Sequence, residues 1–268
     1  MFRLSGLYRY PLKSGAGELL QNTQLDALGV QGDRRWMVVD TQSGRFITQR
    51  LLGQMSQIQA FWLGPDQLQL SAPNMADLTV AVPDTRDNLR GVHIWHDSLR
   101  VPDAGDDAAQ WLSQFLGRSC RLVHVASERA RQIDPVYAEI GQKVAFPDGF
   151  PLLLIGQASL DDLSQRVGRD LEMLRFRPNL VVEGSEAYAE DSWKRIAIGG
   201  IEFKVAKGCS RCIMTTLDPA TGERSVDREP LTTLKTYRQI EGDVFFGQNL
   251  IALSSGALEL GMPVEVLE

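Results

Sequence analysis

Cysteine is scarce in this chain. Its 268 residues include three cysteines, Cys120, Cys209 and Cys212, which are too few for the disulfide framework of a small secreted domain. We therefore expect a reducing, cytoplasmic setting. Two of the thiols lie three positions apart, in the segment Cys209-Ser210-Arg211-Cys212. Thiolates are soft metal ligands and strong nucleophiles, so this segment is the first candidate for chemistry.

Long apolar runs and an excess of positive charge are also absent. No window contains the roughly 18 consecutive apolar residues that a membrane-spanning helix needs, and the N-terminus alternates polar and apolar residues, unlike a signal or transit peptide. The net charge is −6, whereas a general nucleic-acid binder presents a basic face. We expect neither a membrane span nor a nucleic-acid partner, while a local basic pocket would still suit a small anion.

The remaining composition is that of a globular protein with an ample core, because 43% of the residues are hydrophobic and 23% are charged. Short runs of strand-forming residues dominate, and glycine, proline, asparagine or aspartate separate them. We predict strands at residues 36–40, 67–71, 78–82, 121–125, 152–155, 179–182, 201–205, 250–253 and 263–267.

Helical spacing is present at three places. Residues 106–107 are placed to cap a helix that ends at Gly117. Ser159 is placed to cap a helix over residues 160–167, and Pro230 suits the first turn of a short helix.

Together these elements predict a mainly β protein with some helix. We expect a small β-rich N-terminal domain over residues 1–120 and a larger, barrel-like C-terminal domain over residues 121–268, with peripheral helices on its rim. The polar stretch 127–149 predicts a loop near the domain junction.

Functional groups gather at four turn signals. Residues 11–14 end the first strand-like run, residues 32–36 and 175–179 lead into predicted strands, and residues 209–212 follow one. Strand ends that feed loops are where a rigid scaffold presents functional groups. Taken singly, a cation such as Lys13 is typical of an exposed surface, so one cluster alone decides nothing.

The pair Cys209 and Cys212 leaves three interpretations open. A zinc half-site requires two further ligands, and only Cys120 and three histidines remain. A thioredoxin-like pair opens a helix within a βαβ unit, whereas residues 213–217 are typical of a strand. In the third interpretation, one thiolate binds a metal whose other ligands come from another group. Composition alone does not decide among them.

Taken together, the clusters resemble the MOSC family, named for the C-terminal domain of molybdenum cofactor sulfurase, and within it the mitochondrial amidoxime-reducing components and their bacterial counterparts. The resemblance covers nearly the whole chain, with an N-terminal MOSC-associated β domain before the MOSC domain. Its motifs are, in chain order, Tyr10-Pro-Leu-Lys-Ser14, Gly32-Asp-Arg-Arg-Trp36, Phe176-Arg-Pro-Asn179, Tyr188-Ala-Glu-Asp-Ser-Trp193, Cys209-Ser-Arg-Cys-Ile213, Thr215-Thr-Leu-Asp-Pro219, Glu229-Pro-Leu231, Leu234-Lys-Thr-Tyr-Arg238 and Phe246-Gly-Gln248.

The resemblance implies a molybdenum cofactor, Mo-molybdopterin, with Cys212 as the catalytic metal ligand supplied by the protein. Cys209 corresponds to a non-ligand position. Gly149 and Phe150 fall where relatives carry Thr and Ser, so a contribution to cofactor binding there must come from backbone groups. The other positions that match cofactor contacts supply cations, hydroxyls and an amide, which suit a phosphate and a pterin edge: Lys13, Ser14, Arg34, Arg177, Asn179, Ser210 and Arg211.

The implied activity is the reduction of N-hydroxylated compounds and N-oxides, such as amidoximes and hydroxylaminopurines, with loss of the oxygen as water. Some bacterial relatives carry a C-terminal iron–sulfur domain, whose cysteines do not follow Cys212 here. We therefore expect a separate electron-donor protein of the ferredoxin, flavodoxin or cytochrome b5 type. The alternative is a non-enzymatic carrier that holds molybdenum cofactor, or a sulfur bound to Cys212, for transfer to another protein.

Overall fold

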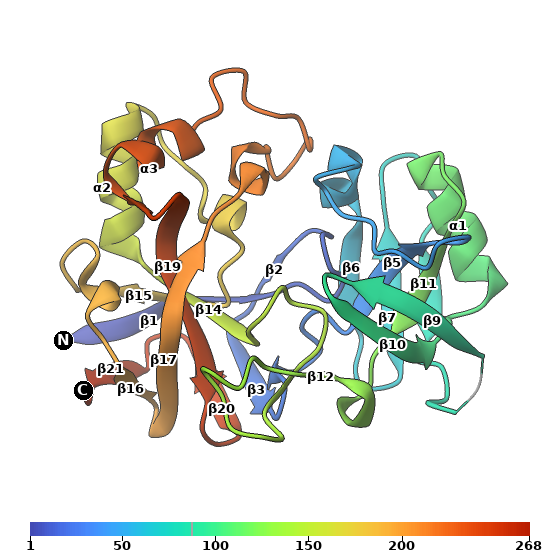
Figure 1. Ribbon diagram of the computed structural model, residues 1–268, viewed down its shortest axis with the longest axis horizontal. Coiled ribbons are helices and arrows are strands. Elements are labelled where there is room, and N and C mark those ends of the chain that lie inside the picture. Colours follow the sequence, from blue (N-terminus) through green and yellow to red (C-terminus); the bar gives the residue numbers. More distant parts are fainter. Residues whose placement is uncertain (87) are drawn as a thin grey trace.

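The computed structural model describes residues 1–86 and 88–268, and its largest element is a closed β-barrel of seven strands (Figure 1). The strands follow the order β14-β15-β1-β21-β16-β17-β19, and β19 pairs again with β14. The predicted mainly β fold with a barrel is therefore confirmed. The strands of the barrel are β1 (Phe2–Arg9), β14 (Leu152–Gly156), β15 (Leu180–Glu183), β16 (Arg195–Ile198), β17 (Ile201–Ser210), β19 (Asp243–Ala252) and β21 (Pro263–Val266).

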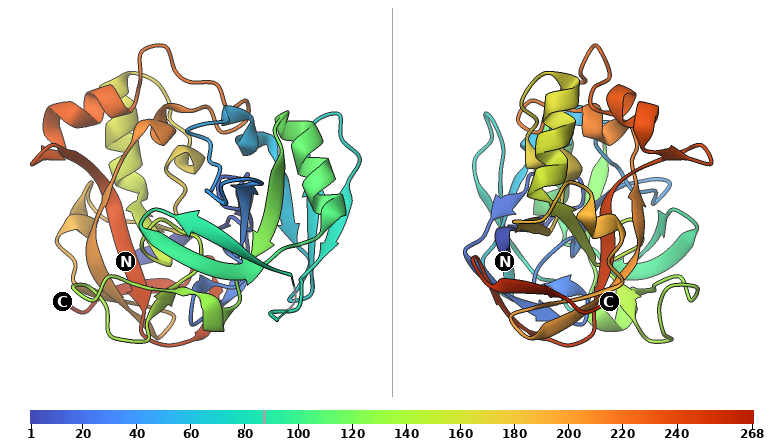
Figure 2. Two further views of the ribbon diagram at one scale, coloured as in Figure 1. Left: turned by 45° about the vertical axis from the view of Figure 1, so that its right-hand side comes forward. Right: turned by 90° about the vertical axis from the view of Figure 1, so that its left-hand side faces the viewer.

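The first strand of the chain closes this barrel. In β1, Leu7 lies opposite Leu180 of β15, and Phe2 lies opposite Val264 of β21. The side chains of Leu4 and Leu7 are fully buried in the barrel core. The core thus combines residues from the two ends of the chain, and both termini lie on the barrel (Figure 2).

The other half of the molecule, which we call the small-sheet body, consists of three small antiparallel sheets and helix α1 (Figure 1). Two strands of the chain form with the predicted bounds, and the other predicted strands differ by one residue at one or both ends, except that β17 and β19 are much longer. The elements of this body are β5 (Trp36–Asp40) with β11 (Cys120–His124), β9 (Leu89–Ile94) with β10 (Asp97–Pro102), β6 (Gln59–Trp62) with β7 (Gln67–Ser71) and β8 (Leu78–Ala81), and α1 (Asp106–Leu116).

Short elements complete both halves. Residues 127–149, predicted as a loop, contain a 3-10 turn and a two-strand ladder. The short strands are β2 (Glu18–Leu19), β3 (Asn22–Asp26), β4 (Gly29–Val30), β12 (Arg131–Gln132), β13 (Lys143–Val144), β18 (Gln239–Ile240) and β20 (Gly256–Glu259). The 3-10 helices are η1 (Gly53–Gln57), η2 (Ser127–Arg129), η3 (Met173–Phe176), η4 (Ala189–Asp191) and η5 (Ile213–Thr216).

The helices lie where their apolar spacing predicts them, but their N-terminal ends differ from expectation. In α1 the N-cap is Gly105, Asp106 lies in the first turn, and Gly117 ends the helix in a left-handed conformation. Helix α3 (Leu231–Tyr237) is present as predicted, but Pro230 is its N-cap and lies just before the first turn rather than in it. Within the described residues, no helix has both the length and the apolar character needed to cross a membrane.

Ser159 does not cap its helix. Helix α2 (Gln157–Val167) begins two residues earlier, with Gly156 as N-cap. The Ser159 side chain is fully buried, and its hydroxyl donates to the Glu190 carboxylate at 2.8 Å. The prediction was wrong because the serine hydroxyl is used in a tertiary contact rather than at the helix end.

The role of β1 predicts that residues 121–268 do not fold alone. Without β1, the edges of β15 and β21 are unpaired and the barrel core loses its N-terminal leucines, so this fragment should show no cooperative unfolding. Residues 1–31 fused behind residue 268 by a flexible linker should restore the transition. Circular dichroism and thermal unfolding of both proteins measure this, and a cooperative transition in the fragment alone would contradict the expectation.

Candidate functional site

A cavity of about 450 Å³ lies where the barrel meets the small-sheet body, a boundary that we call the seam. The structure brings all ten residues implicated by the resemblance to this one cavity, from both halves of the sequence. Their part in binding a cofactor stays a prediction. They are Lys13, Ser14, Arg34, Gly149, Phe150, Arg177, Asn179, Ser210, Arg211 and Cys212.

The cysteine segment reaches the cavity through an irregular strand end. The pairing of β17 with β19 changes register twice within residues 205–210. Just beyond the strand, the Arg211 N–H donates to the Val244 carbonyl at 2.6 Å. Such bulges bend a strand and re-aim its side chains, and here they bring Cys212 to the cavity wall.

Residues 213–217 were predicted as a strand, and this prediction was wrong because they contain the 3-10 helix η5. The hydroxyl and the N–H of Thr215 both donate to the Cys212 carbonyl at 3.1 Å. The Thr216 hydroxyl donates to the Ile213 carbonyl at 2.7 Å. Local bonds of this kind compete with strand pairing, and they hold the backbone of Cys212 at the start of a tight turn.

The two thiols of the segment have different surroundings. Cys212 Sγ accepts a hydrogen bond from Arg50 Nη2 at 3.3 Å. Cys209 packs against an apolar cluster that includes Leu234 and Phe246, and burial raises the pKa of its thiol. In the described part of the chain, no three His, Cys, Asp or Glu side chains form a metal site, and no α-helix begins at this pair. The described residues therefore contain neither a complete zinc site nor the helix that a thioredoxin-like redox pair opens.

Two guanidinium groups in the cavity wall have no carboxylate partner among the described residues. Arg211 donates to the carbonyls of Phe246 and Phe176 at 2.8 and 2.9 Å. Arg177 donates to the Gly15 carbonyl at 2.6 Å. The Nη2 atom of each arginine is buried and has no hydrogen-bond partner. Because an unpaired buried donor is costly, both groups are suited to an anion that brings acceptors.

Arg34 positions Arg177 at the seam. Arg34 donates to Asp33 at 2.6 Å and to Asn179 at 3.0 Å, and it also donates to the Arg177 carbonyl at 2.9 Å. Both guanidinium groups lie over the ring of Tyr10, at 4.4 and 4.2 Å from its centroid. Burial and then the charge of Arg34 lower the pKa of Arg177 to about 10. This lowering indicates that too little negative charge lies near Arg177 to balance its positive charge.

Lys13 is buried, contrary to the expectation for a lone surface cation. Only 5% of it is exposed, and its Nζ donates to the Phe146 carbonyl at 2.7 Å and to Asp148 at 2.6 Å. The chain turns inward after β1, where the Lys13 N–H donates to the Trp36 carbonyl. Burial lowers the pKa of Lys13 to about 8, in spite of the opposing charge of Asp148.

Three of the ten predicted residues carry no charged side chain and lie where the backbone is part of the cavity wall: Ser14, Gly149 and Phe150. Ser14 has a left-handed backbone with φ of 65°, and its carbonyl accepts a bond from Gln49 at 3.0 Å. A Cβ at Gly149 would meet no atom within 4 Å, so packing leaves room for a side chain at this position. The Phe150 ring lies edge-on to Tyr137 and belongs to an apolar cluster.

The lining as a whole is positively charged, although the chain carries −6. Its charged residues are the carboxylates Asp148 and Asp243 and the cations Lys13, Arg34, Arg50, Arg175, Arg177, Lys207 and Arg211. Arginines with a buried, unpartnered Nη2 in a cavity that is also lined by a thiol fit a ligand that combines a phosphate, a polar ring and a soft metal. The residues present therefore fit Mo-molybdopterin.

Sequence reasoning missed several residues of this lining, among them Arg50, Trp95 and Asp148. Asp148 is adjacent to Gly149 and was within reach of the motif comparison. Arg50 lies in no motif, and its partner Cys212 is 162 positions away, so no local signal could have found it.

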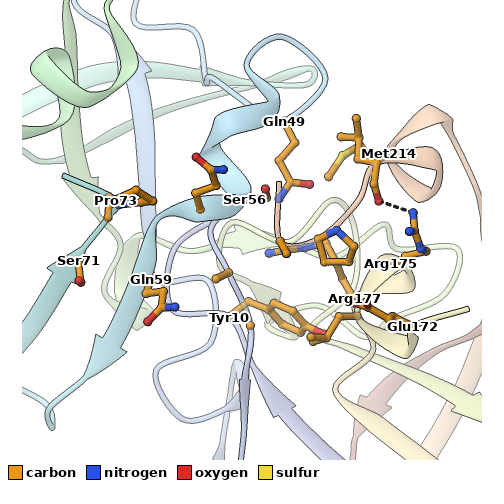
Figure 3. A pocket seen from close by; sticks show the side chains of 18 residues that line it. Tyr10, Gln49, Ser56, Gln59, Ser71, Pro73, Glu172, Arg175, Arg177 and Met214 are labelled. Carbon is orange, nitrogen blue, oxygen red and sulfur yellow. Dashed lines mark hydrogen bonds between the residues drawn. The ribbon is translucent and has the colours of Figure 1, made fainter. Parts of the chain in front are cut away.

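A second cavity, of about 540 Å³, shares Arg177 with the first (Figure 3). Arg175, Arg177 and Met214 line both cavities. Tyr10 and Gln49 reach the second cavity from the N-terminal half of the chain. Neither cysteine of the segment lines it, so the sulfur groups belong to the first cavity.

Comparison with known proteins agrees with the motif pattern. Residues 1–119 match the family model of the MOSC N-terminal beta barrel domain, and residues 141–265 match that of the MOSC domain. The chain is 36% identical over 279 residues to mitochondrial amidoxime-reducing component 1 of Mus musculus, covering 97% of this chain and 81% of that protein.

Two further proteins are similar to this chain. Mitochondrial amidoxime reducing component 2 of Homo sapiens is 34% identical over 277 residues, covering 96% of this chain and 81% of that protein. Among solved structures, the YUAD protein from Bacillus subtilis has a TM-score of 0.45 at 13% identity, covering 99% of this chain and 95% of that one.

The surroundings of Lys13 predict a pH-dependent affinity for a phosphate-bearing ligand. With a pKa of about 8 instead of the usual 10.5, the ammonium is charged at pH 7 and mostly neutral at pH 9. Affinity for molybdopterin should therefore fall about tenfold over this interval. Lys13→Met should weaken binding already at pH 7 and remove this pH dependence.

Titration of cofactor-free protein with molybdopterin at both pH values measures this effect. Arg118→Met is a matched control, because Arg118 is an exposed cation outside the lining that pairs with Asp40. The same pH slope in the parent protein and in Lys13→Met would show that another group is responsible.

Proposed function

The chain belongs to the MOSC-domain family that includes the mitochondrial amidoxime-reducing components, and from this premise we propose that it is a molybdenum-cofactor-dependent reductase of N-hydroxylated compounds. The observation that carries the proposal is the make-up of the cavity at the seam. Its lining combines the thiol of Cys212 with Arg177 and Arg211, whose Nη2 atoms are buried and have no hydrogen-bond partner. This lining suits a cofactor that brings its own phosphate, ring and metal.

The proposed roles follow from the contacts. Cys212 would supply the one protein sulfur on the metal. Lys13, Arg177 and Arg211 would bind the anionic groups by charge-assisted hydrogen bonds. Arg34, which already bonds the Arg177 carbonyl, would keep that residue in place.

The proposed reaction breaks an N–O bond, consumes two electrons and two protons, and releases the oxygen as water. When bound, molybdenum supplies the two-electron exchange and the acceptance of oxygen that this reaction needs. The chain contributes ligation, orientation and a partly enclosed cavity. Its substrates would be small molecules such as amidoximes, hydroxylaminopurines and N-oxides. A separate donor protein of the ferredoxin, flavodoxin or cytochrome b5 type would deliver the electrons, in a cytoplasmic setting.

The different surroundings of the two thiols predict different effects of substitution. Cys212→Ser should abolish reduction of a benzamidoxime and lower the molybdenum content, because serine offers no soft ligand. Without cofactor, its unfolding temperature should stay close to that of the cofactor-free parent protein, since the residue lies at a loop. Cys209→Ser should retain most activity and cost some stability through lost packing.

Molybdenum content, turnover with an artificial electron donor and thermal unfolding of the three proteins measure this. Equal loss of activity in both variants would contradict the assignment of Cys212 as the ligand. A fully loaded parent protein that reduces no N-hydroxylated substrate but passes its cofactor to an acceptor protein would favour the carrier function instead.

A further inference from the structure

Arg50 contacts the side chain on which the proposed chemistry depends. Its Nη2 lies 3.3 Å from Cys212 Sγ, within hydrogen-bonding distance. The same Nη2 is 3.5 Å from the Asp148 carboxylate. Arg50 lies two residues after Thr48 in the small-sheet body, whereas Cys212 lies two residues beyond the end of β17, so the contact crosses the seam.

Trp95 and Asp148 hold the Arg50 guanidinium in place. The ring of Trp95 lies 4.9 Å from it, centroid to guanidinium carbon, a cation–π distance. Trp95 Nε1 donates to Asp148 at 3.3 Å. Trp95 also occupies the first position of the two-residue turn between β9 and β10 with φ of 54°, where glycine or asparagine is usual. The hairpin thus keeps an unfavourable backbone that brings this ring to the cavity edge.

The salt bridge to Asp148 alone does not account for the placement of Arg50. Asp148 has a closer cation, Lys13, at 2.6 Å against 3.5 Å for Arg50. A partly exposed ion pair with an N–O distance of 3.5 Å, like that of Arg50 and Asp148, contributes little to stability. The sulfur is the nearer partner of Arg50, and the guanidinium places positive charge and an N–H directly beside it.

This inference rests on the proposed function. We propose that Arg50 is a positioning residue for the metal-ligating sulfur: it directs Cys212 Sγ into the cavity and raises the reduction potential of the bound molybdenum. Groups that bond to a ligand tune the metal it holds. Hydrogen bonds and charge at a ligand sulfur stabilise the electron-rich, reduced state of a metal centre. A thiolate keeps free lone pairs when it binds a metal, so the Arg50 contact is compatible with ligation.

The first experiment uses the molybdenum-loaded protein. Redox titration followed by electron paramagnetic resonance should show a lower molybdenum potential in Arg50→Met than in the parent protein. Arg50→Lys, which keeps the charge but not the planar fork, should lie between them. Arg118→Met removes an exposed arginine outside the lining and should leave the potential unchanged. An unchanged potential in Arg50→Met would overturn the proposal.

The second experiment uses cofactor-free protein and does not depend on activity. Thermal unfolding of Arg50→Met, Cys212→Ala and the double variant forms a cycle that isolates the contact. The double variant should lose less in unfolding temperature than the sum of the single losses, because both single changes break the same bond. If the losses in unfolding temperature are additive, Arg50 and Cys212 do not interact, and the proposal is wrong. The molybdenum content of the parent protein reports separately on the proposed function, so the two failures are distinguishable.

Discussion

The closure of the barrel by β1 is the constraint on which the rest of the structure depends. A strand from the start of the chain fills the space between two strands from its second half. Directly after β1, Leu12 forms a β-bridge with Trp36, and the Lys13 N–H donates to the same residue. The barrel and the small-sheet body are therefore joined by paired backbone rather than by a flexible linker. This connection keeps the cations of the N-terminal half at a fixed spacing from Cys212.

The connection between the two halves brings positive charge together in one cavity of a negatively charged protein. The chain has net charge −6, yet its cavity at the seam gathers cations from both halves. Arg177 and Arg211 are bonded only to neutral carbonyl groups, which leaves their charge uncompensated and costs folding energy. Functional sites commonly break a rule of stability in this way. An anionic cofactor would supply the missing counter-charge, so binding it should also stabilise the seam.

Local sequence pattern predicted local structure well, but it could not predict the contacts between the barrel and the small-sheet body. Alternation and turn residues located β5 and β7 with correct bounds, because these signals act within a few residues. The pairing of β1 with β15 and β21 depends on contacts between distant parts of the chain and leaves no local trace. The Arg50 contact with Cys212 was missed for the same reason. Residues 213–217 were predicted as a strand because composition does not show that Thr215 and Thr216 bond to nearby carbonyls. The motif residues converge because the resemblance reflects a whole fold rather than a local pattern.

The structure also explains why two cysteines at a spacing typical of paired thiols need not act as a pair. Cys209 is still within β17 and rests on the apolar cluster beneath α2 and α3, whereas Cys212 lies beyond the bulged strand end. The apolar contact raises the pKa of the first thiol, and Arg50 donates a hydrogen bond to the second. A zinc half-site needs both sulfurs as ligands of one metal, and a redox pair needs the two sulfurs to bond to each other. The bulges place the two sulfurs in different surroundings: Cys209 packs against the apolar cluster, and Cys212 faces the cavity, where it is the proposed metal ligand.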